Sequence, residues 1–311
     1  MRDAGQARGI RVALLVAVLA LGLATAPSVA LADPVAFLPA PGSPIDIKFV
    51  NHESLLCGGA PCPLPAPGFG FPAGATLEGI ATATSIVNPT TGAAYWMSVP
   101  FISPASDATE LNAAFWGLTV IASALNVATG KIDTLFAGGT LDIYNIAYDG
   151  GGVFVTGAPA GPLLIPPPPG PVPPPGAAQV CPPGGCPPPW LSATYTPYVD
   201  PVTGLLITLK ASFDPATGSG TSQGWLTVTG GTAFSYFDSN AFLTPGGGVA
   251  DANFKNTFEA CPAPGCAPGW PLVSNDPISA QVAPEPTTLL LWGTSLLGIG
   301  AIGRWRRRRQ D

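Results

Sequence analysis

The chain has 311 residues, of which 47% are hydrophobic and only 10% are charged, whereas soluble domains carry about 25% charged residues. Fifteen acidic residues and four lysines lie between Asp33 and Ala283, a balance of −11, and all eight arginines lie outside this body. An acidic body repels phosphate backbones, so nucleic acid is excluded as an expected partner. The 39 glycines, 39 prolines and many aromatic residues indicate turn-rich β structure with a low-complexity insert.

Residues 1–32 have the layout of a secretory signal peptide. Three arginines precede an apolar stretch from Val12 to Ala24, and Ala30 and Ala32 place small residues where signal peptidase requires them. We expect cleavage before Asp33. The apolar stretch is shorter than the roughly 20 residues of a membrane span, and an uncleaved N-terminal anchor is the alternative.

Two regions, 33–157 and 190–281, have the pattern of strands. Short runs rich in threonine, valine, isoleucine and aromatic residues are bounded by glycine and proline, which predicts an all-β fold made of one or two antiparallel β-sandwiches. A helical period is found only in the terminal segments, so we expect an N-terminal signal helix and a C-terminal transmembrane helix. The expected strands include 45–50, 76–87, 93–99, 115–122, 139–147, 152–156, 205–213 and 225–229.

Four turns between these runs share the pattern Asx-x-x-Thr-Gly, with proline second in three of them. In such a turn the Asx side chain accepts a backbone N–H ahead of it, and glycine takes a left-handed conformation before the next strand. This chemistry predicts β-hairpins and therefore antiparallel pairing. The turns are Asn88–Gly92, Asn126–Gly130, Asp200–Gly204 and Asp214–Gly218.

The six cysteines form three pairs, each with the spacing C-x4-C. Because export leads through an oxidising compartment, we expect disulfides, and the repeated spacing favours pairing within each motif. The alternative is a metal site that uses His52 with a neighbouring cysteine pair, or the thiolates of two motifs. The expected disulfides are Cys57–Cys62, Cys181–Cys186 and Cys261–Cys266.

Residues 158–189 contain fifteen prolines, which cannot enter a sheet and favour extended polyproline II. The segment is either a stiff linker between two β domains or a long loop of one domain.

Few residues in the body suggest catalysis or metal binding. Segment 220–224 matches G-x-S-x-G, but the only histidine, His52, precedes it, whereas the nucleophile elbow needs a later one; we interpret the segment as a loop. Glycoside hydrolysis needs two carboxylates, and the sequence distinguishes no pair. No cofactor is expected, with calcium bound by acids in turns as an alternative to simple turn formation. These acids are Asp142, Asp149, Asp200, Asp214, Asp238 and Asp251.

Residues 282–311 contain three features in a fixed order. Pro284, Glu285 and Pro286 come first, and 17 residues without a charge follow, from Thr287 to Gly303. Such a helix spans roughly 25 Å, enough for a thin bilayer. The arginines that follow stop transfer and stay on the cytoplasmic side. They are Arg304, Arg306, Arg307, Arg308 and Arg309.

This order resembles the PEP-CTERM sorting signal of Gram-negative bacteria. The resemblance covers about 30 residues and implies processing near Pro284, Glu285 and Pro286 by exosortase, a membrane protease-transpeptidase. It also implies a context of exopolysaccharide and biofilm production. A plain tail anchor is the alternative. The stretch from Gly138 to Asn145 is in addition similar to flocculation-associated members of the family.

We therefore expect an exported, non-catalytic surface or extracellular-matrix protein that acts in adhesion or glycan contact. It would be anchored in the inner membrane through its C-terminal helix and, after processing, lie at the cell surface or outside the cell. The expected partners are signal peptidase and exosortase as processing enzymes, the inner membrane transiently, and an exopolysaccharide. The alternatives are a secreted polysaccharide-active enzyme and a purely structural spacer.

Overall fold

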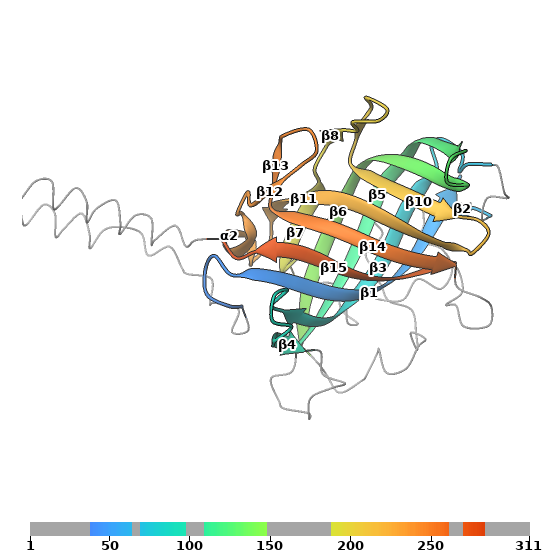
Figure 1. The fold of residues 1–311 in the computed structure, drawn as a ribbon. Helices are drawn as coiled ribbons and strands as arrows, with labels where there is room; N and C mark the ends of the chain where they lie inside the picture. The colour runs from blue at the N-terminus through green and yellow to red at the C-terminus, as the bar shows by residue number, and fades with distance from the viewer. Residues whose placement is uncertain (1–37, 64–68, 98–108, 148–187, 261–269, 284–311) are drawn as a thin grey trace, which may run out of the picture. The chain divides into compact units, whose positions relative to one another are not determined.

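Strands make up most of the regular structure. The computed structural model describes residues 38–63, 69–97, 109–147, 188–260 and 270–283. One large antiparallel sheet contains most of the strands (Figure 1). Its members are β1 (Pro44–Cys57), β2 (Ala60–Pro61), β3 (Thr76–Val87), β4 (Ala94–Met97), β5 (Thr109–Asn126), β6 (Lys131–Ala147), β7 (Leu191–Tyr195), β10 (Leu209–Asp214), β11 (Ser219–Gly230), β14 (Ala252–Ala260) and β15 (Leu272–Gln281).

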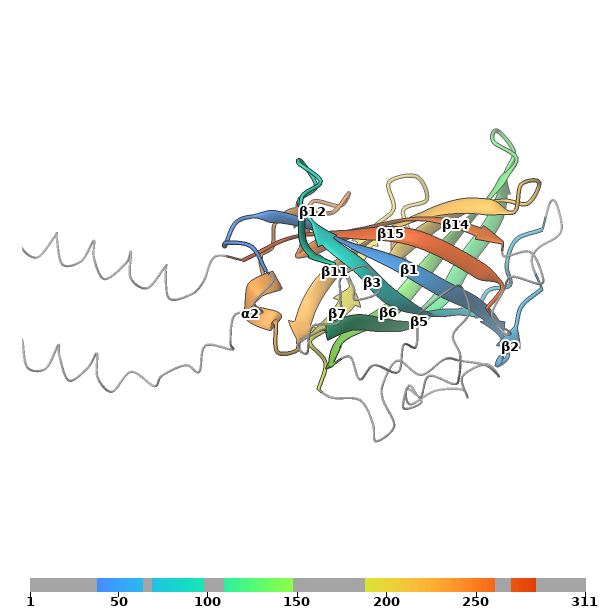
Figure 2. The ribbon, with the colours of Figure 1, turned by 90° about the horizontal axis from the view of Figure 1, so that it is seen from below.

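The sheet closes on itself through β1. The pairing order runs β1-β15-β14-β11-β10-β6-β5-β3, and β3 pairs again with β1. Figure 2 shows β1 between β15 and β3, as the registers require. β7 and β10 share one place in this order, because each pairs with a different part of β6 and of β11.

The antiparallel all-β prediction is confirmed, but the predicted sandwich architecture is not what the described residues form. A sandwich packs two sheets face to face. Here a single sheet curves round until β1 pairs with β15 on one edge and with β3 on the other. In the pairing order, β15, β14, β11 and β10 from 190–281 are consecutive, and so are β6, β5, β3 and β1 from 33–157. The two blocks pair with each other at β1–β15 and at β10–β6, so the two β-rich regions build one sheet. The proline-rich segment joins β6 to β7, which are paired strands of that sheet.

All four predicted hairpin turns are confirmed. In each, the glycine N–H donates to the Asx carbonyl oxygen at 2.8–2.9 Å, and the glycine φ is 70–71°. The Asx side chain accepts a backbone N–H two or three residues ahead, as Asn88 does from Thr90 at 2.8 Å and Asp214 from Ala216 at 2.9 Å. The turns connect β3 to β4, β5 to β6, β10 to β11, and the two strands of a small separate hairpin, β8 (Tyr198–Val199) and β9 (Leu206–Ile207).

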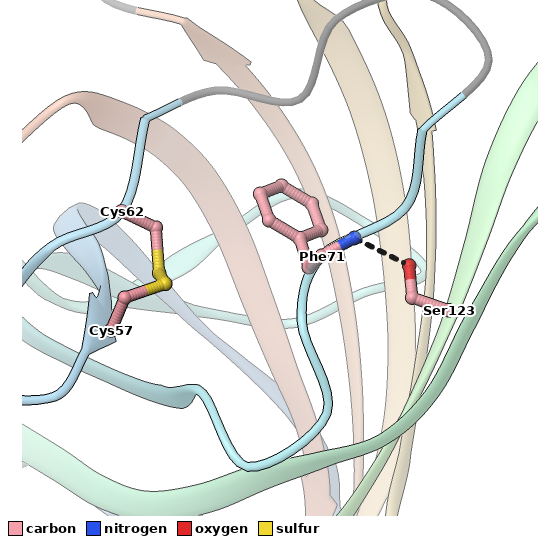
Figure 3. Close-up of a disulfide and its surroundings, with 4 residues drawn as sticks. All are labelled: Cys57, Cys62, Phe71 and Ser123. Carbon is pink, nitrogen blue, oxygen red and sulfur yellow. Dashed lines mark hydrogen bonds between the residues drawn. A yellow bond between two sulfur atoms is a disulfide. The ribbon is translucent and has the colours of Figure 1, made fainter.

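Two segments outside the sheet, one carrying Phe71 and the other the short helix α2, add side chains to the core inside the closed sheet. The ring of Phe71 lies 6.3 Å from that of Phe213, and the Phe71 N–H donates to Ser123 Oγ at 3.0 Å (Figure 3). The short helix α2 (Phe234–Phe237) buries Phe237 among inward-facing side chains of the sheet. Two cavities of about 40 and 10 Å³ lie between these side chains, so the interior described here is a packed core.

The segment that carries Phe71 follows a disulfide. Cys57 ends β1 and is bonded to Cys62 (Figure 3). Cys62 N–H donates to the Leu55 carbonyl at 2.6 Å. This disulfide was predicted. Cys181, Cys186, Cys261 and Cys266 lie outside the described residues.

The predicted terminal segments also lie outside the described residues. These include the cleavage site at Ala30, Ala32 and Asp33, the motif Pro284–Pro286, and both predicted helices. Within the described ranges, the helical structure does not reach the length and apolarity of a membrane span.

The hairpin glycines provide a test of the turn chemistry. No atom lies within 4 Å of the position that a Cβ on Gly130 would take, so a substitution there tests backbone conformation alone. We expect Gly130→Ala to lower the free energy of unfolding by about 1–2 kcal/mol, because alanine resists a left-handed φ. Urea unfolding should show a lower midpoint with an unchanged slope.

Gly130→Asn is the matched control, since asparagine tolerates the left-handed region. It should lose clearly less stability than Gly130→Ala. Equal losses in the two variants would contradict the role assigned to φ.

Candidate functional site

A groove of about 670 Å³ lies on the outer face of the sheet, over β10, β11, β14 and β15. Its position follows from the alternation of side chains along the strands. Leu209, Ala211 and Phe213 of β10 line the interior cavity, so Lys210 and Ser212 between them face outward. These strands lie side by side in Figure 1. Their outward residues line the groove and form its floor.

The floor consists of two rows of polar side chains that run across the strands. In the first row Lys210 of β10 is paired with Gln223 of β11, and Gln223 with Lys255 of β14. The second row runs parallel to the first, displaced from it by two residues on β10, β11 and β14, and it continues onto β15. Its members, each paired with the next, are Ser212, Thr221, Thr257 and Asn275.

Two hairpins that pack on the same outer face form the walls of the groove. One is β8–β9, which contributes Tyr198, Asp200 and Val202, and the other joins β12 (Phe242–Leu243) to β13 (Val249–Ala250) and contributes Pro245.

A small apolar cluster attaches these hairpins to the sheet. Tyr198 and Ile207 of one hairpin and Ala250 of the other pack with Trp225 and Leu135 of the sheet. The rings of Tyr198 and Trp225 meet edge to face, with centroids 4.7 Å apart. Because Trp225 is only 7% exposed, it supports the groove and does not offer a flat aromatic surface.

Asp200 has several partners at the rim of the groove. Its carboxylate accepts the N–H of Thr203 at 2.9 Å and the Thr203 hydroxyl at 2.8 Å, and Lys210 Nζ lies 3.2 Å away. Burial alone would raise the pKa of Asp200, but these donors outweigh it and hold the pKa below its ordinary value. Burial and the nearby Asp200 charge raise the pKa of Tyr198 to about 12, so its hydroxyl stays protonated.

The sequence reasoning missed this floor and misplaced part of it. Segment 220–224, interpreted as a loop, lies within β11 and pairs with β10 and β14. The interpretation failed because the small polar residues typical of turns also suit an outward strand face, and only the pairing distinguishes the two. A period-two pattern could have identified the floor: Phe254, Asn256 and Phe258 face inward while Lys255 and Thr257 face outward.

Within the described ranges, the acids considered for calcium mostly have other partners. Asp251 is 1% exposed and accepts the N–H groups of Val228, Ser239 and Asn240 at 2.7–2.8 Å. Asp214 stabilises its own turn, and Asp142 accepts a bond from Tyr144 at 3.4 Å. Asp149 lies outside the described residues. The structure brings no three His, Cys, Asp or Glu side chains together as a possible metal site in the part of the chain that it describes.

The metal alternative for His52 with Cys57 and Cys62 is wrong in this structure, because a disulfide joins the two sulfurs and leaves no thiolate. His52 lies in β1, and burial lowers its pKa.

A buried carboxyl group lies inside the sheet and was also not predicted. Glu53 of β1 is 3% exposed, and its Oε1 accepts Asn256 Nδ2 at 2.8 Å and Ser274 Oγ at 2.6 Å. Burial raises the pKa of Glu53, and these hydrogen bonds, with one from Asn51, oppose the rise. The group ties β1 to β14 and β15, and it lines the cavity of about 40 Å³.

Comparison with protein-family models, with curated proteins and with solved structures found no match for this chain.

Glu53 makes stability depend on pH. Because its pKa in the folded state lies above the ordinary value of 4.5, the unfolded chain loses this proton first as pH rises. The stabilisation that protonated Glu53 gives to the folded state is complete below pH 4.5. It is lost as pH rises from 4.5 to the pKa of Glu53 in the folded state. We expect Glu53→Gln, which retains the acceptor, to remove this decline in urea-unfolding free energies measured across pH.

Glu53→Leu is the comparison variant. It leaves the Asn256 and Ser274 donors without their acceptor, and we expect a loss of about 1–3 kcal/mol at every pH. A Glu53→Gln profile parallel to that of the wild type above pH 4.5 would contradict the assignment.

Proposed function

We propose that this protein is an exported, non-catalytic surface or extracellular-matrix protein that contacts a polysaccharide through the outer groove. Export and processing rest on the sequence pattern: a signal peptide that ends at Ala32, and a PEP-CTERM-like segment with Glu285 in its motif. Signal peptidase and exosortase are the proposed processing enzymes. The inner membrane holds the chain before its release.

The groove is the observation that supports glycan contact. Its floor offers hydroxyl, amide and ammonium groups in two parallel rows, which suit the many hydroxyl groups of a sugar chain. The groove is open and extends over four strands, as an extended polymer requires. A spacer without a ligand, the structural alternative, would not need this arrangement.

The groove does not favour the hydrolase alternative. Glycoside hydrolysis uses two carboxyl groups on either side of the scissile bond. Among the residues that line the groove, Asp200 provides the one carboxylate, and Thr203 and Lys210 occupy it. We therefore propose binding without turnover.

The folded body extends to the residue before the sorting motif. Val282 N–H donates to the Ser43 carbonyl at 3.0 Å, Ala283 N–H donates to the Tyr236 carbonyl at 2.6 Å, and both side chains are buried. A protease requires an extended and accessible chain. The body therefore protects β15 and the two residues after it.

The mass of the mature protein tests this processing. We expect the protein recovered outside the cell to begin at Asp33 and to end at or beyond Ala283, because the residues before this point are hydrogen bonded in the body. Glu285→Gln should keep the chain in the membrane fraction. A mature C-terminus within β15, or normal release of the variant, would contradict the proposal.

Filling the groove tests glycan contact. Thr221 is an exposed residue at the centre of the floor, and a large aromatic residue is tolerated on a strand face. We expect Thr221→Trp to weaken binding to isolated exopolysaccharide at least about tenfold in a sedimentation assay, because it occupies the space over both rows.

Thr229→Trp is the matched control, since Thr229 is an exposed threonine of the same strand that does not line the groove. It should bind as the wild type does. Equal binding by both variants would place the contact elsewhere, and no binding by the wild type on a glycan array would overturn the proposed function.

A further inference from the structure

The first row of the groove floor concentrates positive charge on an acidic protein. The body between Asp33 and Ala283 has four lysines against fifteen acids, and two of these lysines, Lys210 and Lys255, lie in one row. They are separated by the strand that carries Gln223, which places their backbones about 10 Å apart.

The two lysines differ in their partners. Lys210 Nζ lies 3.2 Å from Asp200 Oδ1, so its charge is largely compensated. Lys255 is exposed and has no ion pair among the described residues. Its cross-strand neighbour is the uncharged Gln223, and Glu259, the next acid on β14, lies four residues along the strand.

An uncompensated ammonium beside an amide suits a negatively charged group. Gln223 and Lys255 both offer N–H donors to one oxygen anion, and a bond to a charged acceptor is stronger than one between neutral groups. The row of Ser212, Thr221, Thr257 and Asn275 runs parallel to it and offers partners for neutral hydroxyl groups. The floor thus has an anion-binding edge and a hydroxyl-binding edge.

We propose that the groove selects an acidic polysaccharide, which lies across the strands with its carboxylate groups on Lys255 and Gln223. This inference rests on the proposed function, because it names the class of glycan that the same groove binds. The polymer's hydroxyl groups meet the parallel row, and Lys210 contributes less because Asp200 neutralises it.

Binding of defined glycans tests the selectivity. The wild-type protein is measured against polygalacturonate, against dextran as a neutral glycan, and against polyglutamate as an acidic polymer without sugar. We expect polygalacturonate to bind most tightly, with an affinity that falls as salt rises because the contact is electrostatic. Lys255→Gln should weaken this binding about tenfold and weaken dextran binding much less, because a neutral hydroxyl group gains less from the ammonium charge than a carboxylate does.

Lys131→Gln is the matched control, because Lys131 is an exposed lysine that does not line the groove and the change in net charge is the same. It should retain wild-type affinity, and thermal unfolding of both variants checks that they fold. Equal effects of the two substitutions, or equal binding of polygalacturonate and dextran, would overturn the acidic selectivity while leaving glycan contact in place.

Two further outcomes are distinct. Polyglutamate binding as tight as polygalacturonate binding would show attraction to any polyanion and overturn the inference. If the wild-type protein bound neither polygalacturonate nor dextran, both the proposed function and the inference would be overturned.

Discussion

Pairing of β1 with strands on both of its edges is the constraint on which the rest of the structure depends. One edge follows β3 and the other follows β15, whose partners in register run from Pro44↔Gln281 to Glu53↔Leu272. A slip of one residue would turn Ile45 and Ile47 outward and Asp46 and Lys48 inward, so the buried face specifies the register. The hydrogen bonds from Asn256 and Ser274 to Glu53 secure the same strands from inside. Closure therefore brings segments from opposite ends of the body into direct contact.

Closure also determines where a ligand can bind. The inward side chains pack together, and Phe71 and Phe237 add to the core, so the interior cavities seen here are small. The concave surface lies on the outside, where the β8–β9 hairpin and Pro245 rise above the strands. Tyr198 and Trp225 hold that hairpin in place. Asp200 has two roles there, since it forms the turn of the hairpin and also binds Lys210 on the floor.

Part of this architecture could be predicted, and the successes and failures have physical reasons. The strand expected at 76–87 has those bounds, because glycine and proline mark its limits in the sequence. β14 and β15 were not among the strands named from the sequence, because Ala252–Ala260 and Leu272–Gln281 contain asparagine, lysine and proline, which are unfavourable in strands. Pairing with β11 and β1 overrides that preference. The match to G-x-S-x-G misled for a related reason, since its polar residues face outward from a strand.

The sequence by itself determined the all-β character, the four Asx–Gly hairpins and the Cys57–Cys62 disulfide. Each of these depends on residues close together in the chain, where side-chain chemistry and backbone preference act directly. Only the tertiary structure decided that the sheet is closed, that Glu53 is buried beside Ser274, and that Lys210, Gln223 and Lys255 form one row. These features join residues that are far apart in the chain, such as Glu53 and Ser274, which are 221 positions apart. Their positions follow from strand registers that no short stretch of sequence specifies.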